Sequence, residues 1–231
     1  MSDAILDAYS GLDSRMKMIE IITNNLANSQ TTGFKRDFGR ILESQQALDV
    51  GSTIDTSSGD LISTGNDLDV AINGQGFFAI QTPSGVRYTR NGSFSLNESG
   101  DLVTKEGMKV LSTSGSPINV AGSNVTIQDG GIVTSDGNEV ATLKIVTFKN
   151  YDLLQKEGSN RLRWNGPADG VQDTDEPKVK GGSLERSNVN SMIEMVHLMA
   201  AYRDFESVQR TLKTLETDMN GKLIQELGNL S

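Results

Sequence analysis

Cysteine is absent from the 231 residues of this chain, and histidine occurs once, at His197. The lack of cysteine excludes disulfides, thiolate metal sites and a cysteine nucleophile. A zinc site requires three or four ligands, and His197 has no cysteine or second histidine to join it. We therefore predict no metal and no cofactor, and we expect His197 on a helix flank or at an interface.

The chain also lacks a basic excess and a visible catalytic set. Lysine and arginine number 21 against 30 acidic residues, which gives a formal net charge of −9. Without a basic face to neutralise phosphates, nucleic acid is not an expected partner. Gly74 and Gly76 lack the third glycine and the following helix of a dinucleotide-binding loop, so a turn is favoured there. The sequence predicts no enzyme activity and no small-molecule substrate.

Long apolar runs are missing as well. No stretch approaches the roughly 20 apolar residues of a membrane-spanning helix. Residues 1–30 lack the basic start and apolar core of a secretory signal peptide. If the protein leaves the cytoplasm, we expect it to do so without a Sec signal.

Glycine and proline are scarce at both ends of the chain. All four prolines, and all but three of the 24 glycines, lie between Gly33 and Gly182. Because these residues form turns and interrupt helices, the pattern predicts an α+β fold, with terminal helices around a central antiparallel β-rich domain. We expect an N-terminal helix and turn over residues 1–34, a short helix and extended linker over 35–66, the β-rich domain over 67–180, and a long helix within 181–231.

The C-terminal segment has the spacing of one long amphipathic helix. Ser191 and Glu194 form a capping-box pattern at its start. Apolar residues then recur at steps of three and four, which places them on one helical face. They are Met192, Met195, Val196, Met199, Tyr202, Phe205, Val208, Leu212, Leu215, Met219 and Leu223. So long an apolar stripe requires a long partner.

The N-terminal segment supplies that partner. Ile5, Leu12, Ile19 and Leu26 fall seven residues apart within a helix expected over residues 4–27. This spacing is typical of a coiled-coil seam. We predict an assembly seam made of these four residues together with Met195, Met199, Phe205, Leu212 and Met219. The alternative is that both helices fold onto the core of a single domain.

Hairpin signals divide the central domain. Asp136-Gly137 favours a two-residue turn that sets Val133 opposite Val140. At Asn91-Gly92 a two-residue turn sets Tyr88 opposite Ser95, whereas a three-residue loop sets it opposite Leu96, and we favour the longer loop. Successive hairpins predict an antiparallel domain of Greek-key or sandwich type.

Four groups of short motifs follow one another along the chain. They are Ala27-Asn28 with Thr31-Thr32-Gly33-Phe34-Lys35-Arg36; Asp67-Leu68-Asp69 with Ile72-Asn73-Gly74-Gln75-Gly76-Phe77-Phe78; Tyr88-Thr89-Arg90 with Gly92 and Phe94; and Gly182-Ser183-Leu184-Glu185 with Ser187-Asn188-Val189-Asn190 and Glu194-Met195-Val196. In this order, and over nearly the whole chain, they resemble the rod and hook proteins of the bacterial flagellum. The resemblance makes Asn28, Thr32, Gly33, Phe34, Asn73, Gly74, Gly76, Phe77, Asn188 and Asn190 the motif residues.

The resemblance implies a structural axial protein that passes through the flagellar type III export apparatus. Its expected partners are other rod proteins and copies of itself, in the periplasm-spanning rod of the basal body. Its terminal helices would form an inner coiled-coil layer and its β domain an outer layer. The short chain and the wording of residues 199–206 resemble the proximal-rod protein most, and the distal-rod protein next; a hook protein would carry a larger inserted domain. From another class, a secreted β-domain binding module on a helical stalk is the alternative.

Overall fold

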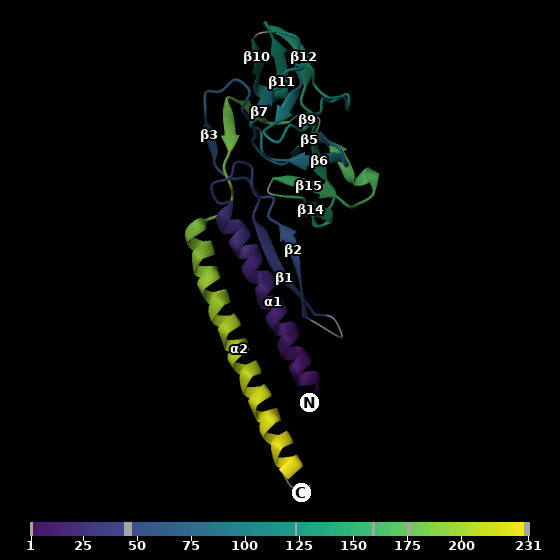
Figure 1. Ribbon diagram of the computed structural model, residues 1–231. Coiled ribbons are helices and arrows are strands. Elements are labelled where there is room, and N and C mark those ends of the chain that lie inside the picture. Colours follow the sequence, from purple (N-terminus) through teal and green to yellow (C-terminus); the bar gives the residue numbers. More distant parts are fainter. Residues whose placement is uncertain (1, 44–47, 123, 159, 175–176, 229–231) are drawn as a thin grey trace. The chain divides into compact units, whose positions relative to one another are not determined.

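The computed structural model describes residues 2–43, 48–122, 124–158, 160–174 and 177–228; for residues 2–8, 41–43, 48–50 and 218–228 it describes the backbone alone. The chain forms two compact units (Figure 1). The first, which we call the helical unit, comprises Met1–Ala27, Asp37–Thr53 and Asn190–Ser231. The second, the β unit, comprises Asn28–Arg36 and Ile54–Val189.

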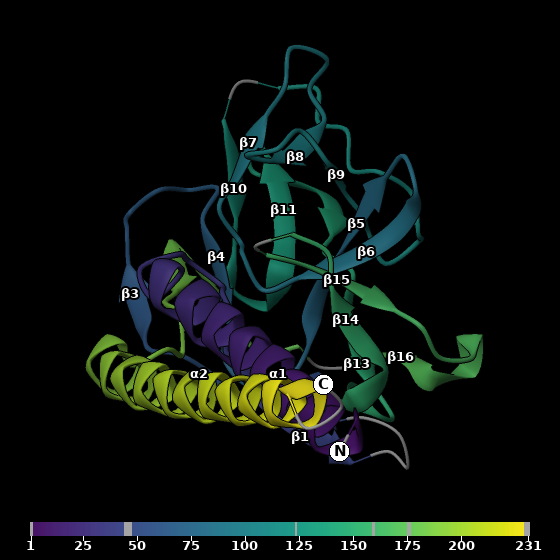
Figure 2. The same cartoon turned by 60° about the horizontal axis from the view of Figure 1, so that its bottom comes forward.

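The helical unit contains two long helices and a β hairpin. Its elements are α1 (Ser2–Ala27), β1 (Asp37–Glu43), β2 (Leu48–Ile54) and α2 (Ser191–Gly228). The two helices lie side by side and run antiparallel (Figures 1 and 2). The Tyr9 hydroxyl of α1 donates a hydrogen bond to Glu216 Oε1 of α2 at 3.2 Å. The two terminal helices expected from the sequence are confirmed.

The short helix expected within residues 35–66 is wrong, because strand β1 occupies residues 37–43 and strand β2 occupies residues 48–54. Gly39 disfavours a helix, and it lets β1 lie directly on α1: a Cβ at Gly39 would come 2.3 Å from Met18 Sδ. Asn25 of α1 anchors the start of the strand, since its side chain donates to the Asp37 carbonyl (2.8 Å) and accepts from the Asp37 N–H (2.9 Å). Close contact with α1 therefore outweighs the weak helical pattern.

Helix α2 begins with a cap one residue earlier than predicted. The Asn190 side-chain oxygen accepts from the N–H groups of Met192 (3.1 Å) and Ile193 (3.2 Å). Asparagine is among the best N-cap residues because its short side chain reaches these free donors. The capping role assigned to Ser191 was wrong. Further along α2, Glu206 pairs with Arg210 at 3.4 Å, one helical turn away.

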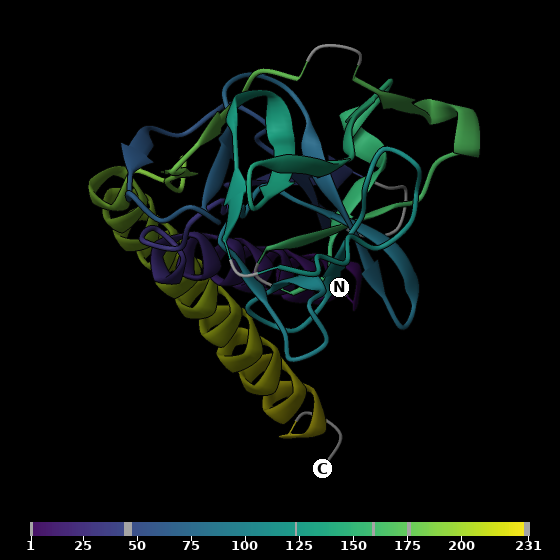
Figure 3. The same ribbon diagram turned by 90° about the horizontal axis from the view of Figure 1, so that it is seen from above.

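The β unit is built from short antiparallel strands (Figure 3). They are β3 (Leu61–Ser63), β4 (Val70–Ile72), β5 (Phe77–Thr82), β6 (Gly85–Thr89), β7 (Phe94–Leu96), β8 (Leu102–Thr104), β9 (Lys109–Val110), β10 (Val125–Ile127), β11 (Ile132–Ser135), β12 (Asn138–Thr142), β13 (Ile145–Phe148), β14 (Leu154–Lys156), β15 (Arg161–Trp164), β16 (Val171–Asp173), β17 (Val179–Gly181) and β18 (Ser183–Glu185). The largest sheet runs in the order β14-β15-β6-β5-β9-β8-β7; β13 joins it through β5, and β16 pairs with β13. Strands β10-β11-β12 form a second sheet, and β17-β4 and β18-β3 form two ribbons. The antiparallel β-rich centre predicted from the sequence is confirmed.

Two buried clusters hold these sheets together. The larger collects aliphatic side chains around Phe78 and Phe94, whose rings meet edge to face with centroids 5.3 Å apart. The smaller is aromatic and centres on Phe148. Trp164, the only tryptophan of the chain, stacks on Phe148 at 5.0 Å and donates its indole N–H to the Pro167 carbonyl. Its fluorescence therefore reports on the β unit.

The structure corrects both hairpin predictions. At Asp136-Gly137 the two-residue turn is present, and both residues have positive φ (51° and 81°). A bulge after Val133 shifts the register, so Val133 lies opposite Ala141 rather than Val140. A bulge adds one residue to one strand and moves every later pair by one. Val140, which lost its predicted partner, is 44% exposed.

Asn91-Gly92 does not close a hairpin at all. Tyr88 lies opposite Ala79 and Leu162, while Leu96 lies opposite Leu102, so neither loop length considered from the sequence is correct. Sequence adjacency favoured the local turn, but β6 pairs with β5 and β15, and β7 pairs with β8. Among the described residues, no helix is long and apolar enough to cross a membrane.

Candidate functional site

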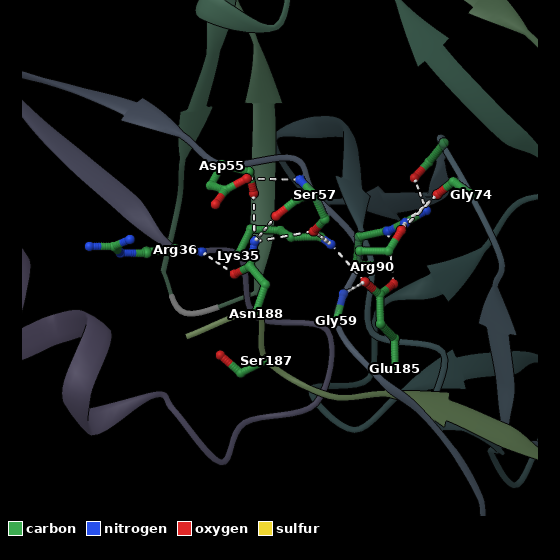
Figure 4. Close-up of polar contacts among 12 residues, drawn as sticks. Lys35, Arg36, Asp55, Ser57, Gly59, Gly74, Arg90, Glu185, Ser187 and Asn188 are labelled. Atoms are coloured by element: carbon green, nitrogen blue, oxygen red, sulfur yellow. Dashed lines mark hydrogen bonds and ion pairs between the residues drawn. The ribbon is translucent and has the colours of Figure 1, made fainter. Parts of the chain in front are cut away.

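The β unit contains a buried cluster of three charged side chains, Lys35, Arg90 and Glu185, with the motif residues Gly74 and Asn188 nearby (Figure 4). Glu185, at the end of β18, lies between Lys35 and Arg90. Lys35 Nζ is 2.6 Å from Glu185 Oε1, and Arg90 Nε is 2.9 Å from Glu185 Oε2. The three residues are 3% (Lys35), 2% (Arg90) and 1% (Glu185) exposed. We call them the charge cluster.

Two cations share the single carboxylate of this cluster, and burial disfavours the charged form of each cation. Burial lowers the pKa of Lys35 and that of Arg90, and in each case attraction to Glu185 opposes the shift. Backbone carbonyls supply further compensation, since Lys35 donates to Ser57 and Arg90 donates to Gly76 at 2.7 Å. Ionic groups removed from water require such partners.

The carboxylate of Glu185 has partners of its own. The Gly59 N–H donates to Oε1 at 2.8 Å, and a Cβ at Gly59 would come 2.1 Å from the Arg186 carbonyl oxygen. Only glycine therefore fits this position. The Arg90 Nε–Glu185 Oε2 contact is an ion pair without good hydrogen-bond alignment, so its contribution is mainly electrostatic. The Arg90 guanidinium also lies 5.6 Å from the centroid of the Phe77 ring, within range of a cation–π interaction.

Next to the charge cluster, two chain segments of the β unit are tied together. The Gly33 N–H donates to the Glu185 carbonyl (2.8 Å), and the Arg36 N–H donates to Asn188 Oδ1 (2.7 Å). Asn188 Nδ2 in turn donates to the Asp55 carbonyl at 3.0 Å. We call residues 33–36 and 185–188 the junction segments, because they lead from the end of α1 and to the start of α2.

Most motif residues thus have an internal role in the structure. Gly33 has φ +68°, and a Cβ there would come 2.3 Å from the Asn91 nitrogen. Thr32 donates to Asn91 Oδ1 at 3.1 Å, and Asn28 accepts from Thr31 at 3.2 Å. The carbonyls of Gly74 and Gly76 accept from Arg90, and the buried Phe77 ring lies beside its guanidinium. Phe34 is buried, with Lys156 Nζ 3.7 Å from its ring centroid. Asn73, by contrast, is exposed, and Asn190 caps α2 in the helical unit.

The charged residues themselves were quoted in the sequence motifs but not identified as a site. The available signal was that Lys35, Arg90 and Glu185 stand in three separate motifs. A small cavity of about 10 Å³ adjoins Lys35, Arg90 and Lys156, which suffices for one water molecule. The charge cluster therefore leaves no room for a substrate, and its effect is to hold segments in place.

In the helical unit, the single stripe predicted on α2 divides into two. One set of residues is buried or half-buried and follows a strict alternation of three and four residues. It consists of Glu194, Leu198, Ala201, Phe205, Val208, Leu212 and Leu215. We call this set the inner seam, and α1 is the helix packed against α2. Of the predicted seam residues on α2 whose side chains the structure describes, Phe205 and Leu212 belong to it, and Met195 and Met199 do not.

The second set is exposed. Met192 is 75% exposed, and Met195, Val196, Met199 and Tyr202 are 50–56% exposed. We call these five residues the outer stripe. At about 100° per residue, its centre lies about 140° around α2 from the inner seam. The predicted stripe was wrong in merging the two, because steps of three and four at the start of α2 fit both faces.

On α1, the predicted seam residues Leu12, Ile19 and Leu26 are half-buried. The side chains of Ile5 and Met219 lie outside the described residues. Tyr9 and Met16 are 49% and 48% exposed. Gly11 is buried, yet no atom lies within 4 Å of a Cβ built there, so the close helix contact that would require glycine is absent from the described structure.

Comparison with known proteins matches three parts of the chain to family models. Residues 6–35 match the flagella basal body rod protein, residues 71–135 the flagellar hook protein FlgE/F/G D1 domain, and residues 180–226 the flagellar basal body rod FlgEFG protein C-terminal region. The flagellar basal-body rod protein FlgF of Caulobacter vibrioides is 31% identical, over 96% of this chain and 98% of its own length. The chain belongs to the flagellar basal-body rod protein family.

Rod proteins of both types are among its relatives. FlgG of Bacillus subtilis is 32% identical over 100% of this chain and 99% of its own length, and FlgF of Rhizobium meliloti is 31% identical over 95% and 97%. The family is structural and not enzymatic. Each residue of the charge cluster comes from a different matched region: Lys35 from the first, Arg90 from the second and Glu185 from the third. The cluster therefore joins the three regions of the chain that match rod and hook protein families.

Proposed function

We propose that this chain is a structural subunit of the flagellar basal-body rod and that it polymerises through the outer stripe of α2. The observation that carries this proposal is an apolar face left exposed on a helix whose opposite face already packs on α1. Fully burying a side chain of this size stabilises a contact by about 1.5–3 kcal/mol, so five half-exposed ones offer about 5 kcal/mol in total. Part of that gain is offset by the cost of association.

The occupant that we propose for the outer stripe is α1 of a second copy. Tyr9 and Met16 are half-exposed on α1, and the Tyr9 hydroxyl donates to Glu216 of the same chain. The acidic residues Asp13 and Glu20 are exposed beside them, and Asp13 pairs with Lys17 at 2.9 Å. Arg203 follows the outer stripe on α2, and it is exposed too. Opposite charges beside two apolar faces favour their pairing and its register.

The geometry of such a contact leads to a polymer. When neighbouring copies point in the same direction, α1 of one copy runs antiparallel to α2 of the next, as the two helices do within one chain. Setting Met16 opposite Met199 then brings Asp13 close to Arg203. The two faces differ, so the contact is head to tail and repeats along a helix, whereas a two-fold contact would stop at a dimer.

The lack of cysteine makes this contact directly testable by cross-linking. A Met16→Cys chain and a Met199→Cys chain are mixed under oxidising conditions, and each is also oxidised alone. We expect disulfide-linked dimers mainly in the mixture. Ser99→Cys, at an exposed loop of the β unit, is the control partner and should link poorly with either chain. Equal linkage of Met199→Cys alone would mean a two-fold contact, and no linkage above the control would refute the pairing.

Finer features of the proposal follow the family resemblance. We infer that the inner seam and α1 form a coiled coil, which the alternation of three and four residues supports. We also infer that the subunit occupies the proximal rod, which the wording of residues 199–206 favours, and that it passes through the flagellar type III export apparatus to a periplasm-spanning rod.

The coiled-coil inference has its own test. Leu12→Asp or Phe205→Asp places a charge in the helix pair, where an unpaired buried charge costs several kcal/mol. We expect loss of polymerisation with unchanged melting of the β unit, followed by Trp164 fluorescence. Loss of β-unit melting would instead favour helices that belong to a common core. If the wild-type chain sediments as a stable small oligomer at high concentration, the result favours the alternative function, a secreted β-domain binding module on a helical stalk.

A further inference from the structure

Methionine is concentrated on the two faces that we propose to meet. Met192, Met195 and Met199 make up three of the five residues of the outer stripe, and Met16 lies on the exposed face of α1. Their exposed fractions are 75% (Met192), 50% (Met195), 56% (Met199) and 48% (Met16). Leucine would bury as well as methionine at such sites, but only methionine carries an oxidisable thioether.

The other two methionines whose side chains the structure describes, Met18 and Met108, are partly buried. Met18 lies against the backbone of β1 at Gly39, where a Cβ would come 2.3 Å from its sulfur. Met108 packs against the larger core cluster of the β unit. The rate of reaction with dissolved oxidants increases with exposure of the sulfur. We therefore expect the exposed methionines of the proposed contact to be oxidised faster than Met18 and Met108.

We propose that Met16, Met192, Met195 and Met199 are sites of reversible oxidation by peroxide, and that their oxidation keeps an unassembled subunit from joining the polymer. This inference rests on the proposed function. In the reaction a sulfur lone pair attacks one peroxide oxygen, the O–O bond breaks and that oxygen is bonded to sulfur. The thioether loses two electrons and becomes a sulfoxide, while hydrogen peroxide is reduced to one water molecule.

The consequence for assembly follows from polarity. A sulfoxide is a strong hydrogen-bond acceptor. In the free subunit it can accept hydrogen bonds from water, but in the apolar contact between subunits it finds no donor. Burying a polar group without a partner is unfavourable, so each oxidised copy binds its neighbour less well. Assembly in turn covers the sulfurs and protects them. Methionine sulfoxide is reduced by dedicated reductases, so the block is reversible.

Site selectivity is tested first, on the dilute full-length chain. Short exposure to hydrogen peroxide is followed by proteolysis and mass spectrometry of each methionine-containing peptide. We expect Met192 to oxidise at least several-fold faster than Met18 and Met108, with Met16, Met195 and Met199 between. Equal rates at all six sites would overturn the proposal.

Assembly is tested second, by sedimentation of treated and untreated chain at high concentration. We expect oxidation to raise the concentration required for assembly by about ten-fold or more, which corresponds to losing the burial of one to two of these side chains. A chain with Met16, Met192, Met195 and Met199 all replaced by leucine should assemble normally and become insensitive to peroxide. Loss of assembly in that peroxide-treated variant would overturn the proposal, because the damage would then lie elsewhere.

A further measurement covers the case in which the leucine variant does not assemble. Partly oxidised wild-type chain is sedimented, and sulfoxide at the four sites is compared between pellet and supernatant. Enrichment in the supernatant supports the proposal, whereas equal distribution overturns it. If untreated chain neither sediments nor cross-links through Met16→Cys and Met199→Cys, the proposed function itself fails and the block on assembly falls with it, while the oxidation rates remain a separate result.

Discussion

The charge cluster gives the sharpest prediction about stability. Glu185→Gln keeps the size of the side chain but leaves Lys35 and Arg90 as two buried cations without a counter-charge, next to an amide 2.6 and 2.9 Å away. Removing one partner of a buried ion pair costs about 3–5 kcal/mol. Since whole domains are stable by only about 5–15 kcal/mol, we expect a fall in Tm of about 10 °C or more for the β unit.

The assay is urea or thermal unfolding followed by fluorescence of Trp164, which lies in the β unit. Glu157→Gln is the matched control, because Glu157 pairs with Arg87 at 2.7 Å but its side chain is 39% exposed. Partly exposed pairs contribute about 1 kcal/mol or less. Lys35→Met should cost less than Glu185→Gln, since it leaves Arg90 and Glu185 as a balanced pair. The reasoning is refuted if Glu185→Gln is no more destabilising than Glu157→Gln.

Three further predictions concern single positions. Gly33→Ala should destabilise the β unit by more than about 2 kcal/mol, because it combines positive φ with a backbone clash; Gly107→Ala, at φ +80° with open space, should lose only about 1 kcal/mol in the same unfolding assay. Gly11→Ala should stabilise the helical unit by about 1 kcal/mol, measured by circular dichroism, and a loss of stability would show that the space around Gly11 is filled. Lys109 and other hydrogen-bond donors lower the pKa of Asp101 to about 2. Ionised Asp101 therefore contributes to the free energy of unfolding above about pH 4, and this contribution is lost as the pH falls toward 2. Lys109→Met should raise this pKa in an NMR titration, and an unchanged value would contradict the assignment.

The sequence predicted those parts of the fold that depend on local pattern. The two terminal helices, the turn at Asp136-Gly137 and the antiparallel centre follow from periodicity and turn chemistry. The bulge after Val133 did not, because it changes the register without changing the residues of the turn. The hairpin of β1 and β2 was missed because its strands are stabilised by contact with α1, which no local pattern encodes.

The candidate site was predicted only in outline. Steps of three and four residues identify apolar faces on a helix, but at the start of α2 they do not tell which face is covered by α1. That distinction depends on where the partner helix lies. The charge cluster escaped notice for a related reason: Lys35 and Glu185 are 150 residues apart, and their pairing has no periodic signal. Long-range pairs between single charged residues become visible only once the chain is folded.

The junction segments have a consequence for how rod proteins vary. The first and last segments of the β unit lie side by side, since the Asn188 N–H donates to the Phe34 carbonyl at 3.4 Å and the Gly33 N–H to the Glu185 carbonyl at 2.8 Å. Apart from β1 and β2, which belong to the helical unit, the residues between these segments form an insert with neighbouring ends, the arrangement in which added residues disturb the rest of a protein least. The alignment with Bacillus subtilis FlgG spans 274 positions against 231 residues here. Because the junction segments hold the two ends of this insert together, its loops can differ in length between rod proteins while the distance between those ends stays the same.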